Sequence, residues 1–423
     1  MALIVPAMMI GCQKPDTPQE DPTPEPPVEK PDTPVTPEPE IQLAPEIKSG
    51  DCVLAPNKFA EEFVTKVTYP DRDYSYSVVL DYHGGYNGQL AEGESVNGDK
   101  SSEYTIRWEA NEAEGKLQLE LSEQETGWSM TKEITAGSNY VDINNLTPNV
   151  HYTYKVSSIE KGTVMTEGNF TTYGHIRQVF FKTRVRNGRD MGGWLTYDGK
   201  MVKYHKIYRT GRWESSTMAN SGKKAIIAEG IKAQLDLRNT SDVLDAPAID
   251  GMDFCAPLIE TGGDSMLKAE KGDKTRQCMQ FIIDCVKADK PVVYHCSLGR
   301  DRTGTLGMII LGLLDVVEGD ISKEYEVTYF SPRGWSIASS ETYKTFQNLR
   351  TTWAYKPAAE YIWAGKYPNG TYEFNDDKES ADYTPFSVRI EKYLLDIGIS
   401  QEDINTFREL MLTEPYADLT PAE

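Results

Sequence analysis

The period of hydrophobic and polar positions changes near residue 175. Between residues 48 and 174, short runs such as Lys116–Leu121 and His151–Val156 alternate apolar and polar side chains. Clusters of Gly, Asn, Asp and Ser separate these runs at the spacing typical of a β-sandwich. From residue 175 onward, apolar runs of strand length alternate with stretches of helical period. The pattern therefore predicts an all-β sandwich domain over 48–174 and an α/β domain over 175–423.

The α/β domain is predicted from strand-like runs and helix-like stretches. Strands are expected at Ala233–Leu237 and Pro291–His295, where the runs have the length of a buried strand. Apolar residues at helical spacing predict helices at Arg276–Ala288, Arg302–Val317, Pro385–Leu395 and Gln401–Leu412.

A proline-rich stretch precedes both domains. Half of the 24 prolines lie before residue 46, and residues 13–48 hold 9 acidic and 3 basic side chains. Such a composition buries too little apolar surface to offset the entropy of ordering. We therefore expect residues 13–47 to form an extended, disordered tether.

The first twelve residues, MALIVPAMMIGC, are a short apolar run that ends in Gly11-Cys12. They resemble a bacterial lipoprotein signal, in which the cysteine is lipidated after cleavage behind a small residue. The run lacks the positive charge that such signals carry. The resemblance implies lipidation of Cys12, export, and anchoring to a bacterial membrane in the periplasm or at the cell surface. The alternative is an ordinary disordered N-terminus with an incidental cysteine.

One loop carries the chemistry. Residues Lys290–Gly304 read KPVVYHCSLGRDRTG, so a buried strand ends at His295, a loop spans Cys296–Arg302, and an apolar helix follows. A strand–loop–helix with Gly299 inside it directs successive backbone N–H groups to one centre, above the positive end of the helix. The sequence therefore predicts a cradle for an oxyanion.

Side chains of known reactivity stand in and beside this loop. The amides and the helix dipole would stabilise the Cys296 thiolate as a nucleophile, and the Arg302 fork matches two phosphate oxygens. Thr303 can hydrogen-bond the sulfur, and His295 is expected to tune the thiolate through hydrogen bonds of the loop. The expected phosphate-binding residues are Ser297, Leu298, Gly299, Arg300, Asp301 and Arg302.

The segment His295–Gly304, HCSLGRDRTG, resembles the loop of the cysteine-dependent protein tyrosine and dual-specificity phosphatases. The Asp before the arginine is similar to an atypical bacterial branch whose loop is HCxAGKDRTG. Here Ser297-Leu298 replaces x-Ala, and Arg300 stands where Lys is usual. The resemblance implies a central sheet flanked by helices, a Cys-x5-Arg phosphate loop, and a reaction through phosphocysteine.

Three earlier segments are similar to the same branch. They are Asn187–Gly193 (NGRDMGG), Ile207–Gly211 (IYRTG) and Ala233–Asn239 (AQLDLRN), and their order ahead of the cysteine loop adds to the resemblance. It covers roughly residues 176–415.

The general acid is less defined. Protonation of the leaving oxygen needs a carboxylic acid within hydrogen-bond reach. Asp236 is our first candidate, because it stands at the end of a strand that leads to the pocket. Asp301, inside the loop, is the second, although it could instead orient Arg302 or the attacking water. Three residues of the following connection remain alternatives: Asp242, Asp245 and Asp264.

The end of the β domain resembles a fibronectin type III-like module. A Leu-x-Pro turn in Val141–Pro148 is followed by a tyrosine-bearing run at Tyr152–Val156 and a Phe-Thr-Thr run in Gly168–Thr172. The resemblance covers about the last third of the domain. The 20 acidic and 9 basic side chains of residues 49–175, a net charge of −11, suggest a solvated spacer or a recognition surface and not a catalytic body.

The leading functional hypothesis is a phosphomonoester hydrolase that acts on proteins carrying phosphotyrosine, phosphoserine or phosphothreonine, or on phosphoinositides. One alternative is an inositol-polyphosphate phosphatase of the phytase-like kind, because Arg300 beside Arg302 adds positive charge. Another is a surface-anchored binding protein whose phosphatase fold is silent, against which the intact Cys296, Arg302 and Thr303 argue. We expect no metal and no cofactor, since His175, His205 and His295 are not spaced as ligands.

The formal net charge of −21 is unevenly divided. Residues 49–175 hold 20 acidic and 9 basic side chains, whereas residues 176–423 hold 36 acidic and 32 basic ones. Within 176–224 there are 12 basic and only 3 acidic residues. The acidic total argues against a nucleic-acid partner, but this local excess of positive charge is compatible with a phosphorylated substrate.

Overall fold

The computed structural model describes residues 52–53, 64–65, 103–181, 185, 187–213, 218, 220–239, 243–330 and 355–416. The lipoprotein-like segment with Cys12, the tether over 13–47, and most of the first half of the expected β domain lie outside the described residues. Within the described part of the chain, no helix is long and apolar enough to cross a membrane.

The N-terminal region consists of strands, as its alternating pattern predicts. Strands β1, β7, β6, β3 and β4 form one sheet in that order, and β2 pairs with β5. The pairs are antiparallel except for β1 with β7. The bounds are β1 (Cys52–Val53), β2 (Tyr104–Arg107), β3 (Leu117–Glu123), β4 (Ser129–Ile134), β5 (Tyr140–Ile143), β6 (His151–Ser158) and β7 (Val164–Tyr173), with a short helix η2 (Glu112–Glu114).

Both of these sheets contribute to a single apolar cluster. Leu117, Leu119 and Leu121 are buried at every second position of β3, and they pack with Ile106 of β2 and Val141 of β5. The alternation of buried and exposed side chains along β3 is that of a strand with one face in a core. The strands of this region are thus confirmed, whereas the closer likeness to a fibronectin type III module stays a prediction.

The C-terminal region is built on a mixed five-stranded sheet with helices around it. The strand order is β12-β11-β13-β10-β8, parallel throughout except that β8 runs antiparallel to β10. The bounds are β8 (Arg189–Asp190), β10 (Ile207–Thr210), β11 (Ala233–Asp236), β12 (Asp253–Cys255) and β13 (Val292–His295). A separate pair joins β9 (Met201–Val202) to β14 (Leu412–Thr413). Both strands expected in this region are present.

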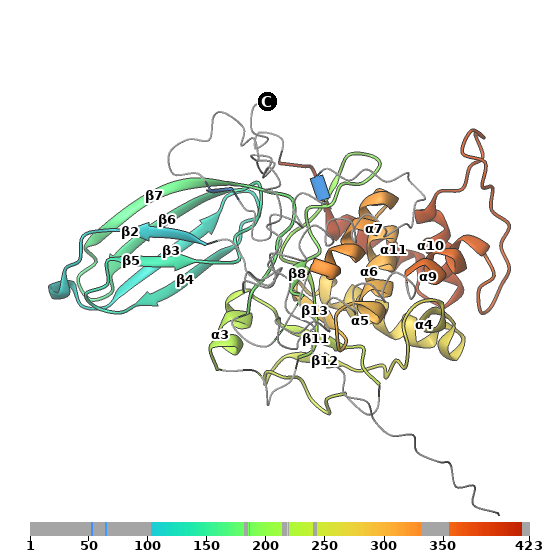
Figure 1. Cartoon of the computed structure of the whole chain (residues 1–423), viewed down its shortest axis with the longest axis horizontal. Coiled ribbons are helices and arrows are strands. Elements are labelled where there is room, and N and C mark those ends of the chain that lie inside the picture. The colour runs from blue at the N-terminus through green and yellow to red at the C-terminus, as the bar shows by residue number, and fades with distance from the viewer. Residues whose placement is uncertain are drawn as a thin grey trace, which may run out of the picture. The chain divides into compact units, whose positions relative to one another are not determined.

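Helices follow the strands and fill the C-terminal half of the region. Figure 1 shows α5 and α6 beside β11 and β13; α5 contacts both strands and α6 contacts β13. The α-helices are α3 (Asn220–Ala228), α4 (Asp264–Lys268), α5 (Asp273–Lys287), α6 (Asp301–Leu313), α7 (Glu318–Glu326), α9 (Tyr355–Ala364), α10 (Phe386–Asp396) and α11 (Gln401–Met411). Two short 3-10 helices are η3 (Ala269–Gly272) and η4 (Val327–Phe330).

One expected helix is shorter than its apolar pattern. The helix predicted over 302–317 ends at Leu313, because Asp315 adopts a left-handed conformation with φ of 61°. The amide of Val316 then donates to the Leu311 carbonyl, which closes the helix end. The chain turns at once into α7, which the sequence pattern did not predict.

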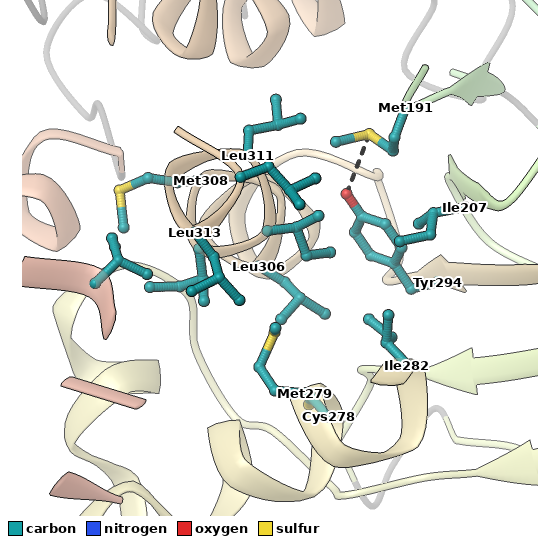
Figure 2. Packing of buried hydrophobic residues seen from close by; sticks show 14 of the residues in the cluster. Met191, Ile207, Cys278, Met279, Ile282, Tyr294, Leu306, Met308, Leu311 and Leu313 are labelled. Atoms are coloured by element: carbon teal, nitrogen blue, oxygen red, sulfur yellow. Dashed lines mark hydrogen bonds between the residues drawn. The ribbon is translucent and has the colours of Figure 1, made fainter. Parts of the chain in front are cut away.

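Side chains of β13 alternate between two cores. Val292 and Tyr294 belong to the cluster that includes α5 and α6, whereas Val293 packs on the other side with Trp213. Figure 2 shows the Tyr294 hydroxyl directed at the Met191 sulfur, 3.4 Å away, and Met279 of α5 pointing toward Leu306 of α6. This packing holds the end of β13 and the start of α6, between which the cysteine loop runs.

A buried polar network joins the β region to the α/β region. Glu123 of β3 accepts hydrogen bonds from the Tyr152 hydroxyl at 2.5 Å and contacts His205 Nε2 at 2.8 Å. Burial alone would raise the pKa of Glu123, but His205 and Arg177 outweigh it and lower the pKa to about 2. Arg177 donates onward to Asp190 of β8 at 3.1 Å. The β region is therefore connected to the sheet that carries the cysteine loop.

Candidate active site

The cysteine loop leaves β13 at His295 and enters α6 at Asp301. Cys296 is buried, with 3% of its surface exposed. Gly299 has φ of +68°, and a Cβ there would lie 2.5 Å from the Thr210 carbonyl oxygen. Only glycine fits at this position. Any other residue would strain the backbone at this positive φ, and its Cβ would clash with the end of β10.

Three backbone carbonyls of the loop accept hydrogen bonds from residues of neighbouring segments. Ser297 O accepts from the Arg212 amide at 3.2 Å. Asn187 Nδ2 donates to Leu298 O at 3.4 Å and to Gly299 O at 2.9 Å. Since the peptide bonds are trans, the amides of the residues that follow these carbonyls point to the opposite side. With the positive end of α6, this arrangement can bind an anion.

The surroundings of Cys296 favour its thiolate. Burial alone would raise the pKa of the thiol, but the Arg302 charge and hydrogen bonds from Thr303 outweigh burial and lower the pKa. Among the described residues, the buried Thr303 hydroxyl has no other partner of good hydrogen-bond geometry. It is therefore available to the sulfur. A thiolate at neutral pH is the reactive form of cysteine as a nucleophile.

His295 is held as a neutral ring behind the loop. Gln234 Nε2 donates to His295 Nε2 at 2.9 Å, and the Ala248 amide fixes that side-chain amide by donating to Gln234 Oε1 at 2.7 Å. The ring proton is therefore on Nδ1, which lies 3.4 Å from the Cys296 carbonyl oxygen. Burial lowers the pKa of His295 to about 4. His295 thus contacts the backbone of Cys296.

Asp236 is committed to a neighbouring arginine. Arg238 donates to it through Nε at 2.9 Å and Nη2 at 2.7 Å, and both side chains are fully buried. Burial would raise the pKa of Asp236, but the hydrogen bonds and the charge of Arg238 outweigh burial and lower it. A general acid must reach the leaving oxygen, so a fully buried carboxylate bound to an arginine is poorly placed for that role.

Asp301 and Arg300 form a two-point ion pair. Arg300 Nε lies 2.8 Å from Asp301 Oδ1, and Nη2 lies 2.9 Å from Oδ2. The Asp301 side chain keeps 30% of its surface exposed, so it remains within reach of a bound molecule. Of the other acids, Asp245 is exposed, Asp264 pairs with Lys268 at 2.8 Å, and Asp242 lies outside the described residues.

Arg302 is fixed by the segment that follows β12. Its Nη1 donates to the Ile259 carbonyl at 2.8 Å. Gly262 packs directly on the start of α6, where a Cβ would lie 2.7 Å from the carbonyl carbon of Asp301. The Gly263 amide donates to Thr305 Oγ1 at 2.8 Å. This segment holds the first turn of α6 and therefore the guanidinium of Arg302.

Four buried residues behind the loop were not singled out by the sequence: Asn187, Arg189, Arg209 and Glu324. Arg209 Nη2 donates to Gly299 O at 2.6 Å, and both arginines pair with Glu324 of α7. The first three lie inside segments that already carry the family resemblance, so their place could have been found. Glu324 has no local signal, because its partners are more than one hundred residues away in the chain.

The structure thus gathers the expected loop residues around Cys296. Within the described residues, His, Cys, Asp and Glu side chains nowhere form a group of three that could hold a metal ion. Lipidation of Cys12 lies outside the described residues and stays a prediction.

Two comparisons relate the chain to known proteins. The sequence model of the tyrosine phosphatase family matches residues 182–413. A protein of Cupriavidus necator, whose name describes it provisionally as a tyrosine-protein phosphatase, is 23% identical over 164 residues. The alignment covers 33% of this chain and 59% of that protein, so the chain spans less than two thirds of the relative's length. The family match includes the loop from Cys296 to Arg302 and the segment around Asn187.

Proposed function

The chain belongs to the tyrosine phosphatase family, and on this premise we propose that it hydrolyses phosphomonoesters through a phosphocysteine intermediate on Cys296. The observation that carries the proposal is a combination of two features. Asn187 and Arg209 bind the Gly299 carbonyl of the loop, and the pKa of the Cys296 thiol in the same loop is lowered. Those two features together provide a binding place for a phosphoryl group and a nucleophile next to it.

In the first step the Cys296 thiolate attacks phosphorus, an S–P bond forms, and the bond from phosphorus to the leaving oxygen breaks. Arg302 and the loop amides bind the other phosphoryl oxygens, on which negative charge is spread in the transition state. The leaving oxygen takes a proton from a carboxylic acid.

Asp301 is the better candidate for that acid. Both carboxylates pair with an arginine, but Asp236 is fully buried, whereas Asp301 keeps part of its surface exposed at the loop and can reach a bound substrate. Esters with leaving groups of increasing pKa test this role. Asp301→Asn should slow alkyl phosphates far more than p-nitrophenyl phosphate, whose leaving group needs no proton. Equal losses for both substrates would contradict the assignment.

In the second step water attacks phosphorus and gives a proton to the carboxylate that the first step left, which regenerates the acid. The S–P bond breaks, the thiolate is returned and phosphate is released. The Thr303 hydroxyl, which lowers the pKa of Cys296, would stabilise the departing sulfur. Thr303→Val should therefore slow the second step and let phosphocysteine accumulate.

Trapping of the intermediate is the decisive experiment. Wild-type protein mixed with p-nitrophenyl phosphate and quenched in acid should carry one phosphoryl group on Cys296 by mass spectrometry. Cys296→Ser should lose turnover, while Cys285→Ser, which changes a cysteine in the core of α5, should retain it. Turnover by Cys296→Ser or a phosphoryl group on another residue would overturn the mechanism.

Phosphotyrosine, phosphoserine or phosphothreonine proteins and phosphoinositides are the substrates that we favour. The alternative of an inositol-polyphosphate phosphatase drew on the charge of Arg300, which the pair with Asp301 largely neutralises. A panel of phosphopeptides, phosphoinositides and inositol hexakisphosphate, run with wild type and Cys296→Ser, separates these classes. Binding without turnover of any of them would favour the silent binding protein instead.

The N-terminal half suggests where the enzyme works. We propose a lipid anchor at Cys12 and a tether that together hold a fibronectin type III-like domain and the phosphatase domain at a bacterial membrane. Labelling of cells with an alkynyl fatty acid should mark the wild-type protein and leave Cys12→Ala unmarked. Equal labelling of both proteins would exclude this anchor.

A further inference from the structure

We propose that Glu324 is a positioning residue for the cysteine loop, acting through Arg209, Arg189 and Asn187. These four residues, here called the loop-support cluster, lie on the side of the loop away from the anion cradle. The inference rests on the proposed function for its catalytic meaning. Its physical content, the orientation of one peptide of the loop, does not depend on turnover.

Both oxygens of Glu324 are used by arginines. Arg189 donates to Glu324 Oε1 through Nε at 3.2 Å and Nη2 at 3.0 Å. Arg209 Nη1 donates to Glu324 Oε2. A single carboxylate therefore sets the planes of two guanidinium groups, which come from the adjacent strands β8 and β10.

Arg209 of β10 connects Glu324 to the loop. Arg209 Nη2 donates to the Gly299 carbonyl at 2.6 Å, and Asn187 Nδ2 donates to the same oxygen at 2.9 Å. Asn187 Oδ1 in turn accepts from Arg189 Nη1. The Gly299 carbonyl is thus held by two donors whose positions depend on Glu324.

Gly299 is the residue at which this restraint matters most. Without a Cβ, a glycine with φ of +68° has neighbouring conformations within easy reach. A rotation of the peptide between Gly299 and Arg300 would turn the amide away from the cradle and place a carbonyl oxygen inside it. That oxygen would repel both the thiolate and a phosphoryl group. The two donors prevent this rotation.

The loop-support cluster binds the loop through the Gly299 carbonyl, so we assign it a positioning role behind the loop. Arg209 is fully buried, and the other three members are no more than 3% exposed. A buried ion pair is weak grounds for stability, because the loss of hydration offsets most of the attraction. The buried charges of Glu324 and its two arginines are better explained by the hydrogen bond that Arg209 makes to the loop.

The test compares Glu324→Gln with Asp320→Asn. Asp320 is on the same helix, and within the described residues its side chain pairs with Lys323 alone. The first readout is the pH dependence of Cys296 alkylation by iodoacetamide, which reports the thiol pKa without turnover. We expect Glu324→Gln to raise the thiol pKa by about one pH unit or more and Asp320→Asn to leave it unchanged.

Two further readouts address the anion cradle. Competitive inhibition by vanadate should weaken about tenfold or more in Glu324→Gln, and kcat for p-nitrophenyl phosphate should fall more than KM rises. An alkylation profile and a vanadate constant equal to those of wild type in a folded Glu324→Gln protein would overturn the proposal.

Asn187→Gly keeps the test decisive if Glu324→Gln does not fold. Asn187 has φ of 58°, so glycine suits its backbone while the donors to the loop carbonyls disappear. The same shift in thiol pKa is expected, and its absence would contradict the inference. If wild type hydrolyses no phosphoester yet the thiol pKa shifts as stated, the proposed function fails and the positioning role stands.

Discussion

Asp301 binds Arg300 through both of its oxygens, at 2.8 and 2.9 Å, at the first turn of α6. The arginine that distinguishes this loop from the usual HCxAGKDRTG form is therefore directed at a carboxylate of the loop itself. Removal of that carboxylate would leave the Arg300 charge beside the anion cradle.

The first prediction uses this pair. In a Cys296→Ser background, which removes turnover, adding Asp301→Asn should tighten binding of inositol hexakisphosphate more than binding of inorganic phosphate. The reason is that Arg300 then acts as a second anion ligand. Isothermal titration measures both dissociation constants. The same change in both constants, or no change, would show that Arg300 does not face the cradle.

The second prediction concerns Asp236. Asp236→Asn leaves the buried Arg238 guanidinium without its charged partner, which should lower the free energy of unfolding by ~3–5 kcal/mol. The remaining activity should show the same dependence on leaving-group pKa as wild type, because we propose Asp301 and not Asp236 as the general acid. Chemical denaturation and a series of aryl phosphates measure the two effects. A steeper dependence on leaving-group pKa would restore Asp236 to that role.

The third prediction compares two glycines with positive φ. Gly251→Ala meets nothing within 4 Å and should cost only the ~1–2 kcal/mol of a left-handed alanine. Gly299→Ala meets the Thr210 carbonyl oxygen at 2.5 Å as well, so either the loop or β10 must move. Turnover should survive in Gly251→Ala and fall about a hundredfold or more in Gly299→Ala. Kinetics on both variants, with melting temperatures as a check of folding, decide the matter.

The sequence predicted the parts of the site that are close together in the chain. Cys296 lies in a short loop, and Arg302 and Thr303 lie in the first turn of the helix that follows it, so local spacing alone brings them to the same place. Their chemical roles stay predictions. The strand that carries Val292, Val293 and Tyr294 was likewise predicted from its apolar run.

What sequence could not supply are the partners that tertiary packing selects. Nothing near Glu324 indicates that it receives Arg189 and Arg209, because those contacts join α7 to two strands far away in the chain. The sequence placed Asp236 correctly at a strand end. It could not show that the carboxylate is fully buried and paired with Arg238, on which its suitability as a general acid depends. The end of α6 was missed because the left-handed turn at Asp315 interrupts an apolar pattern that continues past it.

The last prediction follows from the neutral ring of His295. Burial lowers its pKa to about 4 in the folded protein, whereas a histidine in the unfolded chain titrates near 6.5. Between these two values the unfolded chain binds a proton that the folded protein does not, so the free energy of unfolding falls as the pH falls from about 6.5 to 4. The full effect of this one group is up to about 3 kcal/mol.

His295→Asn should be less stable than wild type at pH 7, because the hydrogen bond to Gln234 and the packing against Trp213 are lost. The gap should narrow steadily as the pH falls to 4.5, since the variant lacks the group that disfavours folding in acid. Carboxylates such as Glu123, whose pKa is about 2, also make the folded protein less stable in acid. They titrate in both proteins, so their effect cancels in the difference. Urea denaturation at pH 7, 6, 5 and 4.5 measures the gap. A constant difference across this range would mean that His295 is protonated in the folded protein, and the assignment of its proton to Nδ1 alone would be wrong.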